Sequence, residues 1–479
     1  MTDSELLQRT RELATRYLES LPERPVGPAV DLEGLRAALG GQLSEEGESP
    51  TAVIETLASA VEPGLVATAG PRYFGFVIGG SLPAALAADW LTSAWDQNAG
   101  LYAISPAAAV VEEVAAQWLI ELFGLPSSTS VGFTTGATMA NFTCLAAARD
   151  AVLRREGWDV EQDGLVGAPP IHVVVGAEAH VTIFVSLQML GLGRARVHKV
   201  EADGQGRMRP DALQEVLSAL PEGPTIVCAQ AGNVNTGGFD PLEEIVRIAH
   251  ERGAWLHVDG AFGLWATASP RLRELTAGID LADSWTTDAH KWLNVPYDSG
   301  LAFVRDPAPH HDAMTLGAAY YVETAGAERD PYNWVPESSR RARGFAVYAA
   351  LRSLGRAGAA DMIDRCCGLA RRFADSLREE PGVEILNDVV LNQVLVRFTP
   401  LGSDPTEVAA GDAQTRAVVA AVQRDGTCWL GGTTWHGRAA MRISVSGWNT
   451  TEADVDRSAE AIVRCAHEVQ RVPAWARHA

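Results

Sequence analysis

Seven short apolar runs separated by helical segments occupy the middle of this 479-residue chain. They are Ser130 to Thr134, Ile171 to Val175, Ala195 to Val200, Thr225 to Ala229, Ala254 to Val258, Asp283 to Thr287 and Gly300 to Val304. Nearly continuous apolar strands that alternate with helices indicate a mostly parallel sheet covered on both faces. The pattern therefore predicts an α/β fold with a large, mostly parallel sheet, and functional residues at the ends of its strands.

The segments on either side of this pattern predict two further parts. Residues 1–75 begin with a helix from Ser4 to Ser20 and are expected to form an N-terminal helical arm for dimerisation, ahead of the large α/β domain at 76–350. In residues 351–479, a helical stretch leads into three strands, Val383 to Ile385, Gln393 to Phe398 and Met441 to Ser446. This change predicts a smaller C-terminal α+β domain.

The charge and composition of the chain indicate which partners and which cellular compartment to expect. A formal net charge of −21 argues against a nucleic acid or an anionic membrane as partner. Neither a secretory signal nor a bilayer-spanning apolar stretch is visible, so a cytoplasmic protein is expected, with its six cysteines as buried thiols. The cluster at His310 to Asp312 has no further ligands nearby, and no metal is predicted.

Lys291 is one of only two lysines in the chain; the other is Lys199. Arginine stays protonated near neutral pH, whereas a desolvated lysine can lose its proton and attack an aldehyde. A lysine after a strand is more often a solvated loop residue, so its role depends on its neighbours.

Three other strand ends carry residues suited to a ligand. The loop at 135–138, with Gly136, Ala137 and Thr138, leads into a helix and could bind a phosphate through backbone N–H groups, or be a plain capped helix start. Asp259 ends a strand and could pair with a protonated ring nitrogen, or cap the next turn. His180 could stack on an aromatic ligand or be structural.

These parts together match what pyridoxal 5′-phosphate (PLP) needs from a protein. Lys291 offers the amine, the loop at 135–138 a phosphate site, Asp259 a partner for the ring nitrogen and His180 a cover for the ring. The sequence therefore predicts PLP as cofactor, with His257 as an ordinary hydrogen-bonded core histidine.

On these residues, and on segments such as Pro71 to Phe74, Thr236 to Pro241 and Met441 to Ser444, the chain resembles the group II PLP-dependent amino acid decarboxylases. This family includes aromatic-L-amino-acid, tyrosine and glutamate decarboxylases. The resemblance implies a fold type I, aspartate-aminotransferase-like architecture and a homodimer with its active site at the subunit interface. It also implies cofactor-binding roles for Ala137, Thr138, His180, Asp259, Ala261, Ser284, Asp288, His290 and Lys291, and places Arg442 near the pocket mouth.

The implied reaction is decarboxylation of an L-amino acid to the amine and CO₂. The family's mobile loop carries Asp-Tyr-x-x-Trp, whereas this chain reads Asp330-Pro331-Tyr332-Asn333-Trp334, with the phenol displaced by one position. We predict Tyr332 as the catalytic proton donor to Cα, with His180, Lys291 or water as alternatives. Loss of the loop tyrosine is associated in the family with aldehyde-forming enzymes, so oxidative deamination stays open.

The substrate side chain is predicted from the apolar residues near the expected entrance. Phe76, Leu101 and Tyr102, with Arg442, are the predicted substrate-binding residues, and they favour an aromatic or bulky apolar amino acid, unless they form dimer core. The arginines at 340, 341 and 343 could instead bind an acidic substrate, or form structural ion pairs. A PLP aminotransferase or another carbon–carbon lyase remains an alternative, since these enzymes share the cofactor residues.

Overall fold

The structure, a computed structural model, describes residues 2–315, 329–402 and 407–471. The chain forms two compact units, each described separately below. The large unit comprises Gly79–Ala370 and Asn387–Val394, and the small unit comprises Met1–Ile78, Arg371–Leu386 and Leu395–Ala479.

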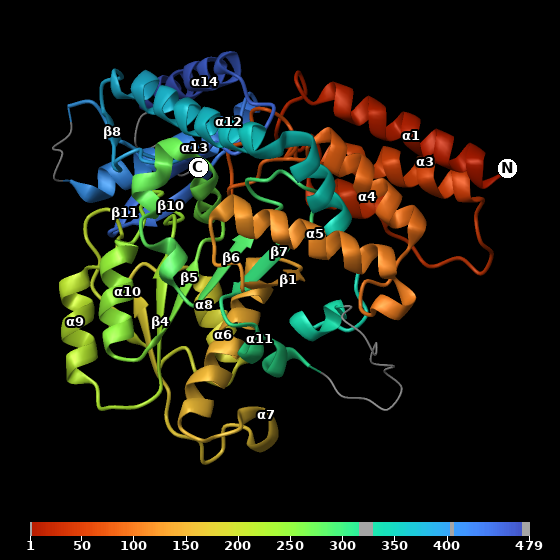
Figure 1. Ribbon diagram of the computed structural model, residues 1–479. Helices are drawn as coiled ribbons and strands as arrows, with labels where there is room; N and C mark the ends of the chain where they lie inside the picture. The colour runs from red at the N-terminus through yellow and green to blue at the C-terminus, as the bar shows by residue number, and fades with distance from the viewer. Residues whose placement is uncertain (1, 316–328, 403–406, 472–479) are drawn as a thin grey trace. The chain divides into compact units, whose positions relative to one another are not determined.

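A seven-stranded sheet forms the centre of the large unit (Figure 1). Its strands are β1 (Ser130–Thr134), β2 (His172–Gly176), β3 (His198–Val200), β4 (Thr225–Gln230), β5 (Trp255–Asp259), β6 (Ser284–Asp288) and β7 (Gly300–Val304). All seven predicted strands are present, and the largest difference is that β3 begins at His198 rather than Ala195. The near-continuous apolar runs were enough to locate these strands, because both faces of the sheet are covered and most strand residues are buried.

The sheet has the order β1-β7-β6-β5-β4-β2-β3 and is mostly parallel, as predicted. Only β7 runs antiparallel to its neighbours, β1 and β6. The connection between β6 and β7 covers only residues 289–299, which is too short for the helical crossover that a parallel pair requires.

Helices cover the large sheet. The helices and 3₁₀ turns of this unit are α4 (Pro83–Trp95), η2 (Tyr102–Ile104), α5 (Pro106–Phe123), α6 (Ala137–Arg155), α7 (Val160–Asp163), α8 (Val181–Met189), α9 (Pro210–Ala219), α10 (Leu242–Glu251), η3 (Gly263–Ala268), η4 (Pro270–Thr276), η5 (Ile279–Leu281), α11 (Pro307–Met314), η6 (Pro331–Trp334) and the part of α12 (Gly344–Arg378) up to Ala370. Buried side chains of α6, α8 and α11 form one core cluster with Ala302 and Val304 of β7. Phe303 points to the opposite face, where it contacts Phe123 of α5.

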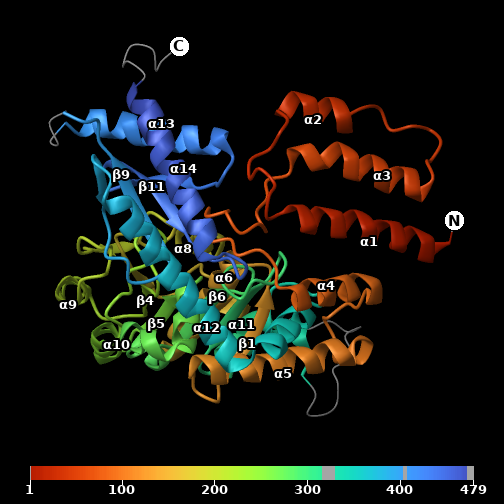
Figure 2. The ribbon, with the colours of Figure 1, turned by 90° about the horizontal axis from the view of Figure 1, so that it is seen from above.

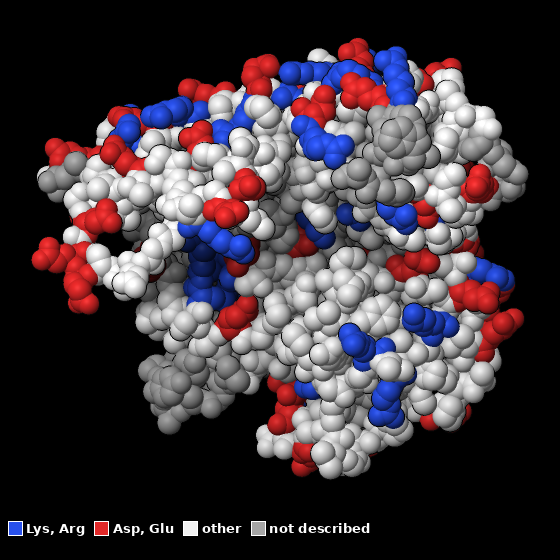
Figure 3. All heavy atoms as spheres, turned by 180° about the vertical axis from the view of Figure 1, so that it is seen from behind, with Lys and Arg blue, Asp and Glu red and all other residues white. Residues whose placement is uncertain are grey.

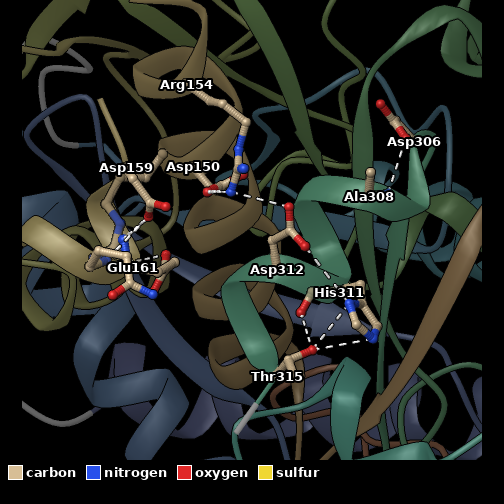
Figure 4. A network of polar contacts seen from close by, with 11 residues as sticks. Asp150, Arg154, Asp159, Glu161, Asp306, Ala308, His311, Asp312 and Thr315 are labelled. Atoms are coloured by element: carbon tan, nitrogen blue, oxygen red, sulfur yellow. Dashed lines mark hydrogen bonds and ion pairs between the residues drawn. The ribbon is translucent and has the colours of Figure 1, made fainter. Parts of the chain in front are cut away.

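The C-terminal half of α6 is tied to α11 by the polar network in Figure 4. Arg154 lies 2.9 Å from Asp150 of its own helix and 3.1 Å from Asp312 of α11. His311 and Thr315 contact each other at the end of α11. This network holds the far end of the helix whose first turn contributes to the site described below.

The small unit combines the two ends of the chain. Helices α1 (Asp3–Ser20), α2 (Leu32–Leu39) and α3 (Pro50–Val61) lie side by side in Figure 2, and the turn η1 (Glu62–Gly64) follows. A second sheet has the order β10 (Gly431–Trp435), β11 (Arg438–Ser444), β9 (Gln393–Phe398) and β8 (Val383–Ile385), with α13 (Val408–Asp425) and α14 (Glu452–Arg471) completing the unit. The first two residues of β9 group with the large unit.

The grouping differs from the three-part division predicted from the sequence, because the N-terminal segment shares a unit with the C-terminal segment. Backbone hydrogen bonds explain this. The Phe74 N–H donates to Trp429 O at 2.8 Å, and the Ser444 N–H donates to Phe74 O at 2.9 Å. The helical stretch expected ahead of the C-terminal strands is one element, α12 (Gly344–Arg378), interrupted at Gly355, where φ is +61°.

The surface and the cysteines agree with the composition. Acidic and basic side chains are interspersed over the face in Figure 3 and are densest along its upper edge. All six cysteines are buried free thiols, as predicted. In the described part of the chain, no helix is both long and apolar enough to cross a bilayer.

Candidate active site

The carboxyl ends of β1, β5 and β6 meet at one edge of the large sheet. β5 and β6 are parallel, and β1 and β6 share a direction because both are antiparallel to β7. Residues that follow these strands therefore converge, as expected for parallel sheets. They are the first residues of α6 after β1, Asp259 at the end of β5, and Asp288 at the end of β6.

The Asp288 carboxylate joins Lys291 to the start of α6. Its Oδ2 lies 2.9 Å from Lys291 Nζ, whose side chain is 19% exposed. Its Oδ1 accepts a hydrogen bond from the Ala137 N–H at 2.6 Å. The predicted amine and the predicted phosphate loop are thus brought together by one buried carboxylate.

His290 is held beside this pair. Its Nδ1 accepts from the Ser299 N–H at 3.2 Å, and its Nε2 lies 3.5 Å from Asp288 Oδ1. The imidazole also contacts the ring of Tyr297, with 4.2 Å between centroids. Burial lowers the pKa of His290, so the ring is neutral near pH 7 and carries its proton on Nε2.

The start of α6 lies close to the backbone of Gly300 and to the ring of His290. No side chain caps it, and among the described residues the N–H groups of Thr138 and Met139 have no hydrogen-bond partner. A Cβ on Gly136 would lie 3.3 Å from His290 Cε1, and one on Gly300 would lie 2.4 Å from the Gly136 Cα. Two glycines therefore allow the close approach that leaves free N–H groups, which is the arrangement that binds a phosphate.

Asp259 presents a buried carboxylate that is 3% exposed. Its Oδ1 accepts from the Ala261 N–H at 3.1 Å, and its Oδ2 accepts from Asn141 Nδ2 at 3.4 Å. Within the described ranges it forms no ion pair, and a buried carboxylate without a cation is costly. This environment suits a ligand that brings a protonated ring nitrogen.

His180 is the N-cap residue of α8 and is linked to Asp259 through two side chains. Its Nδ1 lies 2.8 Å from Thr182 Oγ1 and accepts from the Thr182 N–H at 3.4 Å. Thr182 Oγ1 in turn accepts from Asn141 Nδ2 at 3.2 Å. The sequence analysis did not single out Asn141 or Thr182. Asn141 could have been noticed because it is an amide in an alanine-rich helix, and a buried amide must form hydrogen bonds.

The residues at this edge fit PLP. They supply an amine, a helix start with unpartnered N–H groups and a buried carboxylate without a cation. The phosphate and the pyridine nitrogen of PLP require the last two groups, and its aldehyde requires the first.

Ser284 is not part of this group. It begins β6, four residues before Asp288, so a strand rise of about 3.3 Å per residue puts it roughly 13 Å away. Its hydroxyl is bound in the core to Trp255 Nε1 and His257 Nδ1, each at 2.9 Å. His257 is thereby confirmed as a hydrogen-bonded core histidine.

The predicted substrate residues fall in both units. In the large unit, the Tyr102 N–H donates to Asp330 Oδ1 at 2.8 Å, and the Tyr332 N–H donates to Gly100 O at 2.9 Å, so Leu101 and Tyr102 adjoin the segment that carries Tyr332. Phe76 and Arg442 belong to the small unit. There Phe76 stacks on Trp429 with 5.6 Å between centroids, and burial lowers the pKa of Arg442.

The three arginines that could have bound an acidic substrate are each paired within the chain. Arg340 forms a bidentate pair with Glu112, both bonds at 2.7 Å. The other two pairs join Arg341 to Asp89 at 2.6 Å and Arg343 to Asp298 at 2.7 Å. Each of the three guanidiniums thus has a carboxylate partner within the chain, as the structural-pair interpretation expects.

Comparison with known proteins identifies the family. The family described as "Pyridoxal-dependent decarboxylase conserved domain" matches residues 33–399. An acidic amino acid decarboxylase from Mus musculus is 28% identical over 77% of this chain and 67% of its own length. Tryptophan decarboxylase 1 from Oryza sativa subsp. japonica is 27% identical over 96% of this chain and 92% of its own.

A solved structure extends the likeness to three dimensions. The crystal structure of the Oryza sativa enzyme TDC with PLP and tryptamine has a TM-score of 0.90 and 25% identity, with 98% of both chains covered. The predicted family, fold and cofactor are thus confirmed. Because the family match spans most of its length, this chain belongs to the group II pyridoxal-phosphate-dependent amino acid decarboxylases, which are enzymes of fold type I.

Proposed function

We propose that this decarboxylase acts on an L-amino acid with an aromatic or bulky apolar side chain and releases the amine and CO₂. The observation that carries this preference is the pairing of Arg340, Arg341 and Arg343 with carboxylates of the chain itself. A guanidinium whose charge is already balanced by a carboxylate attracts a second carboxylate more weakly. The apolar side chain of Leu101 and the ring of Tyr102 support the same preference.

A substrate panel tests this proposal. L-tryptophan, L-tyrosine and L-phenylalanine are compared with L-glutamate, L-aspartate and L-cysteine sulfinate, with CO₂ and amine measured for each. We expect kcat/KM to be at least about tenfold higher for the best aromatic substrate than for the best acidic one, which corresponds to about 1.4 kcal/mol of discrimination. If an acidic substrate is turned over faster than the aromatic ones, and if Arg341→Met slows that turnover, the arginine cluster does bind substrate. Ammonia and peroxide in place of the amine would indicate the aldehyde-forming reaction.

The residues of the large unit divide the work of holding the cofactor. In this proposal Lys291 binds its aldehyde carbon, the first turn of α6 with Gly136, Ala137 and Thr138 binds its phosphate, and Asp259 faces its ring nitrogen. His180 would cover the ring and Ala261 would lie beneath it. Bound PLP supplies an electron sink for the pair released when CO₂ leaves. Asp259 strengthens that sink because a fixed carboxylate in a buried site keeps the ring nitrogen protonated.

Replacing Lys291 tests this assignment directly. Lys291→Ala is expected to lose the visible absorption band of bound PLP and all turnover. Lys199→Ala is the matched control, since Lys199 is the only other lysine and lies on β3. A Lys291→Ala protein that keeps the band and the turnover would refute the assignment.

The proton that replaces CO₂ at Cα is proposed to come from Tyr332. The segment that carries this residue is anchored by its backbone to Gly100, and its phenol is buried. Tyr332→Phe is expected to slow amine release while leaving PLP binding unchanged. If the variant keeps the full rate, His180, Lys291 or water supplies the proton instead.

We also propose a homodimer with its active site at the subunit interface. Apolar side chains of the large unit remain exposed on α4 at Trp90, Leu91 and Trp95, and on α8 at Val181, Val185 and Met189. The α8 residues are spaced four apart and therefore form one stripe. Because α8 begins directly after His180, a second copy packed on this stripe would lie beside the site.

Sedimentation tests the dimer. Val185→Arg is expected to weaken association and to lower activity in parallel, whereas Val166→Arg, which changes a 93% exposed valine outside the stripe, should do neither. A fully active monomeric Val185→Arg protein would contradict the shared site.

A further inference from the structure

Asn141 uses its whole hydrogen-bonding capacity inside the large unit. It is fully buried on the second turn of α6. Its Nδ2 donates to Thr182 Oγ1 at 3.2 Å and to Asp259 Oδ2 at 3.4 Å. Its Oδ1 accepts from Thr286 Oγ1 and from His257 Nε2, both at 2.9 Å. An amide has two donors and two acceptor sites, so nothing is left over.

The orientation of this amide follows from its neighbours. An ionised carboxylate only accepts hydrogen bonds, so Asp259 requires the NH₂ group, and Oδ1 must face Thr286 and His257. His257 then donates from Nε2, and its Nδ1 accepts from the Ser284 hydroxyl at 2.9 Å. Burial lowers the pKa of His257 to about 4, which keeps the ring neutral, as this pattern requires.

The other donor of the amide sets the state of His180. Because Thr182 Oγ1 accepts from Asn141, its own proton is free for His180 Nδ1, 2.8 Å away. The Thr182 N–H also points at Nδ1, so this nitrogen is an acceptor. A neutral His180 therefore carries its proton on Nε2, the nitrogen that faces away from this chain of bonds.

We propose that Asn141 is a positioning residue that couples the Asp259 carboxylate to the His180 imidazole, holding both in the states needed to grip the cofactor ring. This inference rests on the proposed roles of Asp259 and His180 at the ring. It adds that a single amide, which need not touch the cofactor, keeps the carboxylate aimed and fixes the imidazole tautomer. The two groups act as one unit because they share this amide.

Few other titratable groups lie around this amide. His257 on β5 faces Oδ1, while Asp259 on β5 and His180, through Thr182, face Nδ2. The thiols of Cys144 on α6 and Cys228 on β4 interact electrostatically with Asp259, and burial raises the pKa of both, so they stay neutral. A carboxylate placed at position 141 would therefore titrate chiefly against Asp259.

Two substitutions at position 141 test the coupling through PLP affinity, measured by titrating the PLP-free protein between pH 5 and 9. Asn141→Ala should weaken PLP binding about 10- to 100-fold at every pH, since it removes a hydrogen bond to a charged group. Asn141→Asp keeps the shape but sets two carboxylates side by side, which share a proton. Its PLP affinity should show one additional ionisation that the wild type lacks.

A third variant separates the two arms of the amide. Thr182→Val removes the hydroxyl between Asn141 and His180 and leaves the bond to Asp259. In PLP-free protein labelled with ¹⁵N-histidine, with the His180 signal assigned by its absence in His180→Gln, the wild type should show the Nε2–H tautomer. Thr182→Val and Asn141→Ala should show a mixture of tautomers. This readout does not depend on turnover.

Thr143→Val is the matched control, because Thr143 is fully buried on the same helix and its hydroxyl donates only to Met139 O at 2.8 Å. It should leave PLP affinity, its pH dependence and the His180 tautomer unchanged. The inference is overturned if the Asn141 variants bind PLP like the wild type, or if Asn141→Asp merely loses affinity equally at all pH values. If those variants are normal while Lys291→Ala and Asp259→Ala lose PLP, the coupling fails but the proposed site stands.

Discussion

The buried pair between Glu112 of α5 and Arg340 is expected to be the most sensitive electrostatic contact in the large unit. Both Glu112 oxygens accept from Arg340 at 2.7 Å, and the side chains of Arg340 and Glu112 are only 1% and 5% exposed. Removing the carboxylate by Glu112→Ala would leave a guanidinium in the interior with no counter-charge. Removing one partner of a buried ion pair lowers the free energy of unfolding by about 3–5 kcal/mol, mostly because the remaining buried charge has no counter-charge. The equilibrium for local opening should therefore shift by roughly two to three and a half orders of magnitude.

The same structure supplies a surface pair for comparison. Asp89 and Arg341 are 2.6 Å apart, but their side chains are 27% and 37% exposed. Solvent screens this pair, so Asp89→Ala should cost no more than about 1 kcal/mol. The double variant Glu112→Leu/Arg340→Met should recover most of the loss, because it removes both charges and keeps apolar volume.

Hydrogen exchange of α5 peptides at increasing urea is the suitable assay, because a chain of two compact units need not unfold in one step. The exchange free energy of α5 is compared among wild type, Glu112→Ala, Asp89→Ala and the double variant. If Glu112→Ala costs no more than Asp89→Ala, the reasoning from burial is refuted. If the double variant is as unstable as Glu112→Ala, the loss arises from packing and not from a stranded charge.

Three further predictions concern the site and the pH dependence of stability. Gly300→Ala would set a Cβ 2.4 Å from the Gly136 backbone, so PLP affinity should fall while the melting temperature changes less; wild-type affinity would contradict the close approach. Burial lowers the pKa of His257 to about 4 and of His310 to about 3, so both are neutral when folded but protonate below about 6.5 when unfolded. The contribution of each neutral histidine to the free energy of unfolding is therefore fully present above about pH 6.5, and below that pH it falls by about 1.4 kcal/mol per pH unit. His310→Gln removes one of the two contributions, so the free energy of unfolding measured by urea titration should fall less between pH 7 and pH 5 than in the wild type. Asp288→Asn keeps an acceptor oxygen but removes a negative charge from the start of α6, so inorganic phosphate should bind the PLP-free protein about two- to fivefold more tightly; weaker binding would show that the charge is needed.

Local patterns were enough to predict the architecture of the large unit. Strands buried on both faces appear as short apolar runs, and the chain has seven of them where the seven strands lie. The rule that functional residues follow parallel strands then led to Lys291, Asp259 and the start of α6, and the contact between Lys291, Asp288 and Ala137 agrees with it. The strand β10 was missed, because its residues Gly431 to Thr434 lack an apolar pattern.

Other features depend on partners that no local pattern specifies. Ser284 was expected to bind the cofactor, yet its hydroxyl is used by Trp255 and His257 at the opposite end of the strand. The carboxylate partners of the arginines at 340, 341 and 343, which are Glu112, Asp89 and Asp298, could likewise not be read from the sequence. The role of each of these residues depends on which side chain it contacts in the folded chain, and the residue type alone does not specify that contact.

The sequence by itself determined the strands of the large sheet, the candidate lysine and the kind of cofactor, because backbone periodicity and strand-end chemistry are properties of short segments. Only the tertiary structure decided that Asn141 joins Asp259, 118 residues away, to Thr182 and His180, and that Arg340 is neutralised by a glutamate 228 residues away. The physical reason is that a buried polar group must find a partner, but register and packing choose which one.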